Sequence, residues 1–87
     1  MTVTKPHLLL VDDDERLREL LFKFLVDKGF FVSTARDAVH ARELMDTFIF
    51  DLMILDVMMP DEDGLSLTDS IRNGPARMKD VPILLLT

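Results

Sequence analysis

An apolar segment that ends on a carboxylate and runs straight into a loop with proline and glycine constrains this chain most. Residues 51–64 read Asp-Leu-Met-Ile-Leu-Asp-Val-Met-Met-Pro-Asp-Glu-Asp-Gly, so the apolar run 52–55 ends on Asp56. Short, continuous apolar runs are typical of strands that are buried on both faces of a parallel sheet. The pattern therefore predicts that a buried strand delivers the Asp56 carboxylate to one edge of a sheet.

Two other apolar runs end on polar side chains in the same way. The run 8–11 is followed by three aspartates, of which Asp12 and Asp13 come first, and the run 81–86 is followed by Thr87. The carboxyl ends of parallel strands lie at one edge of an open α/β sheet, where ligands bind near a topological switch point. We therefore expect these side chains to lie at the same edge as the carboxylate of the central run.

Helical periodicity separates the apolar runs. Apolar residues recur at three- and four-residue steps between the runs, Gly29 follows the first of these segments, and Gly74-Pro75 follows the last. The expected strands are 7–11, 30–34, 52–55 and 81–86, and the expected helices are 14–28, 37–48 and 65–72. A β-α-β-α-β-α-β order predicts a doubly wound parallel sheet with right-handed crossovers and helices on both faces.

A cluster of Asp12, Asp13 and Asp56 predicts a cation site. Three neighbouring carboxylates repel one another, and a hard cation with oxygen ligands relieves that repulsion. Mg²⁺ suits such a site because it accepts one or two carboxylates, keeps several waters and bridges to phosphate. Asp56 is then a candidate nucleophile that attacks phosphorus and forms an acyl phosphate.

Each of these residues also has an ordinary structural interpretation. Aspartate is a leading N-cap residue, so Asp13 and Asp14 are candidate helix caps. The acidic stretch 61–63 is expected to be a solvated loop, and His7 and His40 have no partner at metal-ligand spacing. The prediction of a site therefore depends on the joint arrangement of the acids, not on any single residue.

Composition excludes several function classes. The formal charge of −6 disfavours nucleic acid as a partner of this segment, because phosphate binding requires surplus lysine and arginine. The chain has no cysteine, which excludes disulfides and thiolate metal sites. No apolar stretch is long enough to span a membrane, and the first six residues are not followed by a signal-peptide core. We expect a soluble, cytoplasmic protein.

Three segments resemble the receiver domain of bacterial two-component response regulators. They are Leu-Leu-Leu-Val-Asp-Asp-Asp at 8–14, the segment 51–64 quoted above, and Val-Pro-Ile-Leu-Leu-Leu-Thr at 81–87. The resemblance extends over essentially the whole chain, with the segments in the family's order. It implies a flavodoxin-like fold and a signalling domain that accepts a phosphoryl group from a sensor histidine kinase.

The resemblance also implies a role for each matching residue. Asp56 looks like the phosphoacceptor, Asp13 like a direct Mg²⁺ ligand, and Asp12 like its partner, often acting through water. Met58 would offer its backbone carbonyl oxygen to the metal. Thr87 looks like the hydroxyl that turns toward the phosphoryl group when the domain switches conformation.

The chain departs from the family pattern after its fourth predicted strand. Residues 1–87 match the N-terminal part of a receiver domain and lack the fourth helix, the fifth strand, the fifth helix and the family's phosphate-binding lysine. Lys79 precedes the fourth predicted strand and does not match that lysine. Without a cation there, we expect weak Mg²⁺ binding and poor phosphorylation.

The same departure leaves the predicted strand 81–86 as an apolar sheet edge, which favours pairing with another chain. We expect a homodimer or a segment-swapped oligomer. The alternative is that these residues are an engineered or proteolytic piece of a longer regulator.

The predicted function is that of a phosphoacceptor module that is not a turnover enzyme. The loop sequence Val-Met-Met-Pro at 57–60 and the alternation of strands and helices suggest a winged-helix transcription factor as the parent protein. One alternative is a Mg²⁺-dependent phosphohydrolase of the aspartyl-phosphate type, which usually has a second acid at the position that Met58 occupies. Another alternative is a non-phosphorylated protein-interaction module.

Overall fold

Strands and helices alternate through the whole of residues 5–87, the part of the chain that the computed structural model describes. The elements are β1 (His7–Val11), α1 (Glu15–Asp27), β2 (Phe31–Ala35), α2 (Ala38–Thr47), β3 (Leu52–Asp56), α3 (Gly64–Arg72) and β4 (Ile83–Leu86). The predicted order is confirmed, and each boundary lies within two residues of its predicted position. Differences of that size are expected where helices fray and strands leave a sheet.

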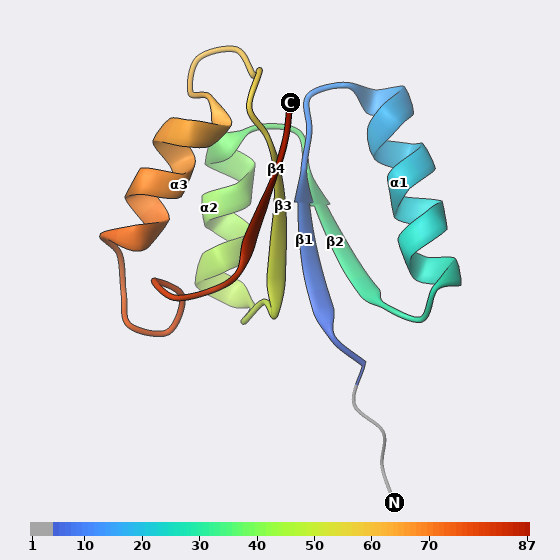
Figure 1. The fold of residues 1–87 in the computed structure, drawn as a ribbon, viewed down its shortest axis with the longest axis horizontal. Helices are drawn as coiled ribbons and strands as arrows, with labels where there is room; N and C mark the ends of the chain where they lie inside the picture. Colours follow the sequence, from blue (N-terminus) through green and yellow to red (C-terminus); the bar gives the residue numbers. More distant parts are fainter. Residues whose placement is uncertain (1–4) are drawn as a thin grey trace, which may run out of the picture.

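The four strands form one parallel sheet in the order β2-β1-β3-β4. Figure 1 shows α1 on one side of this sheet, and α2 and α3 on the other. The chain passes from β1 to β2 on one side of it and then crosses to β3 on the other side of β1. The direction of winding therefore reverses between β1 and β3. This is the flavodoxin-like, doubly wound arrangement that the sequence predicted, and in such folds ligands bind at the carboxyl ends of the strands beside the switch point, here β1 and β3.

An aspartate begins each helix. The carboxylates of Asp14, Asp37 and Asp63 accept the backbone N–H of the residue three positions further on, at 2.7–3.1 Å. This N-cap bond satisfies one of the donors that a helix leaves open at its start. Asp63 belongs to the expected solvated loop and is exposed, and it has the further role of capping α3.

The main core lies between the sheet and the helices α2 and α3. Leu9, Leu55 and Leu67 are fully buried there. By contrast, no residue of α1 is buried, and Leu20 and Phe24 remain 65% and 56% exposed. The apolar face expected for the first helix is thus only partly covered by the sheet.

Within residues 5–87, no helix combines the length and the apolar character that a membrane crossing requires.

Candidate metal centre

Three carboxylates meet at the carboxyl ends of the two central strands. Asp56 is the last residue of β3, and Asp12 and Asp13 directly follow β1. The parallel register pairs Val11 with Leu55, so Asp12 and Asp56 come one residue beyond a paired position. Carboxylate oxygens of Asp12, Asp13 and Asp56 all lie within 4.8 Å of one another. The structure therefore brings together the three acids that the sequence singled out.

The three acids differ in their burial. Asp12 is only 1% exposed, whereas Asp56 is half-buried and Asp13 is exposed. Exposure thus increases from Asp12 through Asp56 to Asp13, and a small ion or a phosphoryl group can reach the two outer carboxylates from solvent.

Asp12 is held by its neighbours along the chain but is not fully satisfied. Its Oδ1 accepts the backbone N–H of Asp14 at 2.9 Å, and its carbonyl oxygen accepts Nη1 of Arg18 at 2.8 Å. Its Oδ2 is buried and has no hydrogen-bond partner among the described residues. A buried carboxylate oxygen without a partner is costly, and a cation is the natural partner for it. The donor set and this oxygen fit a hard divalent ion such as Mg²⁺.

Burial raises the pKa of the Asp12 carboxyl above its ordinary value, and the nearby charges of Asp56 and Asp13 raise it further. The N–H donated by Asp14 opposes this shift, because it stabilises the charged form. Without a cation, the fold therefore disfavours the ionised form of its most buried acid.

The loop that follows Asp56 returns to its starting point. The N–H of Met58 donates to Oδ1 of Asp56 at 3.1 Å, and the N–H of Gly64 donates to the carbonyl oxygen of Val57 at 3.1 Å. The Met58 side chain is 78% exposed, so it does not fill the core. Its backbone N–H links it to the phosphoacceptor candidate, and the role of its carbonyl oxygen as a metal ligand stays a prediction.

Thr87 lies at the same edge of the sheet. It follows Leu86, which is paired with Asp56 at the end of β4, and it is exposed. The role of its hydroxyl stays a prediction as well.

An ion pair beside the site was missed by sequence reasoning. Arg42 in α2 donates from Nη1 and Nη2 to the two carboxylate oxygens of Glu62, both at 2.6 Å. The acidic stretch that includes Glu62 was expected to be solvated, and the structure corrects that expectation. Nothing in the local sequence indicates the pairing, because its partner lies 20 residues earlier on another element.

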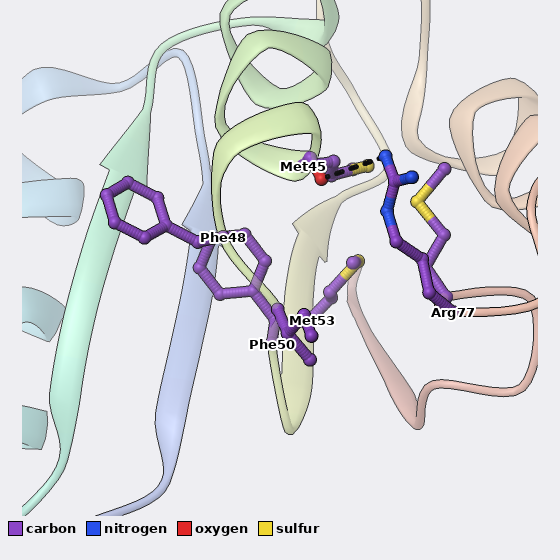
Figure 2. Close-up of a pocket in the computed structure, with 7 residues that line it drawn as sticks. Met45, Phe48, Phe50, Met53 and Arg77 are labelled. Atoms are coloured by element: carbon purple, nitrogen blue, oxygen red, sulfur yellow. Dashed lines mark hydrogen bonds between the residues drawn. The ribbon is translucent and has the colours of Figure 1, made fainter.

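A small cavity lies at the opposite end of the sheet from the three acids. Figure 2 shows it between the end of α2, the start of β3 and the segment that carries Arg77. Its volume of about 10 Å³ has room for roughly one water molecule. It is lined by Met45, Phe48, Ile49, Phe50, Met53, Arg77 and Met78. It is too small and too apolar to hold a substrate.

Comparison with known proteins supports the same assignment. The profile of the response regulator receiver domain matches residues 8–87. Protein PetR of Rhodobacter capsulatus is 58% identical over the whole chain, which covers 35% of PetR. The transcriptional activator protein PfeR of Pseudomonas aeruginosa is 39% identical over the whole chain, which covers 27% of PfeR. The chain therefore spans about a third of the length of these curated relatives.

Solved structures agree with the fold. The N-terminal domain of a response regulator receiver protein from Methanoculleus marisnigri superposes with a TM-score of 0.90 at 28% identity, over 97% of this chain and 68% of that one. The chemotaxis response regulator CheY4 of Vibrio cholerae superposes with a TM-score of 0.88 at 33% identity, over 94% of this chain and 68% of that one. The family profile, the curated relatives and the solved structures all match this chain, and the acidic edge agrees with them. The chain belongs to the response regulator receiver domain family.

Proposed function

We propose that this chain receives a phosphoryl group on Asp56 from the phosphohistidine of a sensor histidine kinase. The observation that carries the proposal is the convergence of three carboxylates within 4.8 Å, with a buried Asp12 oxygen that lacks a partner. The half-buried position of Asp56 allows its carboxylate to meet a phosphoryl group from solvent.

In the transfer, a carboxylate oxygen of Asp56 forms a bond to phosphorus while the bond from phosphorus to the histidine nitrogen breaks. The imidazole leaves with the electron pair, and the product is an acyl phosphate. Asp12, Asp13, Asp56 and the carbonyl oxygen of Met58 would hold Mg²⁺, which would supply positive charge against the incoming phosphoryl group. The Thr87 hydroxyl donates a hydrogen bond to the new phosphoryl oxygen.

The output of this module is proposed to be control of transcription in the cytoplasm. PfeR and the transcriptional regulatory protein GltR of Pseudomonas aeruginosa are relatives at 39% and 41% identity over the whole chain. Residues 1–87 then serve as the N-terminal part of the receiver in such a regulator, and the acidic charge of −6 keeps this part from contributing to DNA binding.

Self-association of the 87-residue chain is proposed from two uncovered apolar surfaces. β4 is an edge strand, and its Leu84 is 53% exposed. The outer residues of α1 are also exposed. An apolar edge strand with unpaired backbone groups pairs readily with another chain.

The phosphoacceptor role is tested by incubating the chain with phosphoramidate, a small phosphoryl donor, with and without Mg²⁺. Mass spectrometry of the intact chain and of its peptides should find one added phosphoryl group on Asp56 in a minor, Mg²⁺-dependent fraction of the molecules, in line with the poor phosphorylation expected from the sequence. Asp56→Asn should abolish it, whereas Asp27→Asn, which changes an exposed carboxylate at the far end of α1, should not. Modification at another residue, or none at all, would contradict the proposal.

A further inference from the structure

One side chain of α2 holds the loop between β3 and α3 from outside. The Arg42 guanidinium donates to both carboxylate oxygens of Glu62 at 2.6 Å, and its Nη2 also donates to the Ser70 hydroxyl of α3 at 3.3 Å. The Ser66 hydroxyl adds a contact to Glu62 at 3.4 Å. The group thus joins α2, the loop and α3, and its two parallel bonds specify a direction as well as a distance.

This pair differs from the other ion pairs of residues 5–87. Arg36–Asp37 and Arg77–Asp46 are single contacts at 3.7 and 3.4 Å between largely exposed side chains. In contrast, the Arg42–Glu62 pair has two contacts of 2.6 Å, and its side chains are 41% and 27% exposed. The bond from Arg42 holds the pKa of Glu62 below its ordinary value, so the pair stays ionised at neutral pH.

The loop that Arg42 holds is the loop that touches the phosphoacceptor candidate. At its start, the N–H of Met58 donates to the Asp56 carboxylate, and at its end Gly64 closes back onto Val57. Between these ends, Asp61 has a φ of 68°, a left-handed conformation that needs support from its surroundings. Glu62 follows Asp61 directly, so the ion pair lies where that support is needed.

We propose that Arg42 and Glu62 are positioning residues for the metal centre. They fix the 57–63 loop so that the backbone of Met58 and the carboxylate of Asp56 keep the arrangement that a divalent cation requires. This inference rests on the proposed function, because it assigns the pair a role in the same Mg²⁺ site. Neither side chain touches the ion, and both act through the loop.

The test measures Mg²⁺ affinity by isothermal titration calorimetry in the 87-residue chain, well below the melting temperature of every variant. Arg42→Gln, Glu62→Gln and the double variant should each weaken Mg²⁺ binding about 10-fold, the lower end of the effect of residues that orient metal ligands. The double variant should be no weaker than either single variant, because the two residues act as a unit. Arg42→Lys should also weaken binding, because it keeps the charge and loses the two parallel bonds.

The matched control is Arg77→Gln, which removes the ion pair with Asp46 and the bond to the Met45 carbonyl oxygen near the C-terminal end of α2, outside the loop between β3 and α3. It should leave Mg²⁺ affinity unchanged. A second readout needs no metal: hydrogen exchange at the Met58 amide should speed up in Glu62→Gln and stay unchanged in Arg77→Gln.

Three results would overturn the inference. Unchanged Mg²⁺ affinity in Glu62→Gln, with only a lower melting temperature, would show that the pair is merely structural. Equal weakening in Arg77→Gln would show a general loss of rigidity. If the unsubstituted chain binds no Mg²⁺, the proposed function fails and the inference fails with it, and this outcome is distinct from the first two.

Discussion

Gly64 begins α3 directly against the carbonyl oxygen of Asp56, the residue that ends β3. A Cβ atom added at Gly64 would overlap that oxygen and would lie 3.0 Å from the Cα of Val57. The colliding atoms belong to the backbone of the phosphoacceptor candidate itself, so the loop between β3 and α3 can close only around a residue without a side chain.

Gly64→Ala should therefore destabilise the chain by about 3 kcal/mol, the upper part of the usual range for overpacking, because the backbone cannot yield as a flexible side chain can. Urea denaturation measures the free energy of unfolding. Gly29→Ala is the control, because Gly29 has a φ of 98° but no atom within 4 Å of the added Cβ. That change should cost about 1 kcal/mol, from backbone strain alone. Equal losses at the two positions would show that the close approach does not matter.

Asp12→Asn should stabilise the metal-free chain at neutral pH. Burial raises the folded-state pKa of Asp12 above the ordinary 3.8, so the folded chain binds more protons than the unfolded chain in that range. The free energy of unfolding therefore falls as pH rises from about 3.8 through the raised pKa. An amide cannot ionise, so the free energy of unfolding of the variant should not fall over this pH range. At pH 7 it should exceed that of the unsubstituted chain by on the order of 1 kcal/mol.

Thermal or urea unfolding across pH 3 to 8 without divalent ions, in a chelating buffer, checks this expectation. Asp13→Asn is the control, since Asp13 is exposed and its carboxylate retains its water. If the stability of Asp12→Asn depends on pH in the same way as that of the unsubstituted chain, Asp12 is not the source of the fall in stability.

Mg²⁺ should stabilise the chain by about 1.4 kcal/mol at ten times its dissociation constant, since it binds the folded state alone. For a domain of this size the melting temperature should rise by roughly 6–11 °C, and circular dichroism can follow it. The combined variant Asp13→Asn with Asp56→Asn should lose the rise, because two of the three converging carboxylates are gone. NaCl at matched ionic strength separates binding from screening, and an equal rise with NaCl would contradict a specific site.

Leu84→Lys should shift the chain toward monomer. Leu84 lies on the edge strand β4 and is 53% exposed, and a charge on an edge strand opposes pairing with another chain. Multi-angle light scattering over a range of concentrations measures the change. Val39→Lys is the control, because Val39 is 67% exposed on α2 and lies away from the sheet edge. A monodisperse monomer for the unsubstituted chain at high concentration would contradict self-association.

Sequence patterns were sufficient for the fold and for the centre of the site. The apolar runs before Asp12, Asp56 and Thr87 predict buried parallel strands, and parallel strands bring their carboxyl ends to one edge. The convergence of Asp12 with Asp56 follows from that rule once the two strands are neighbours. Strand and helix order is local information, and so is the position of an acid at the end of a strand.

Side-chain partners between distant elements were not predictable in this way. The pairing of Arg42 with Glu62 depends on how α2 lies against α3 and on the path of the loop between β3 and α3. The exposure of Leu20 and Phe24 likewise depends on how much of α1 the sheet covers. An apolar helical face has the same sequence pattern whether or not a neighbouring element covers it.

The sequence by itself thus determined which residues end the strands and, through the parallel winding, which acids share an edge. Only the tertiary structure decided that Asp12 lies buried with an unpartnered oxygen, that Gly64 touches Asp56, and that Arg42 reaches Glu62. The physical reason is range: periodicity and capping act over a few residues, whereas burial and ion pairing depend on packing between elements far apart along the chain.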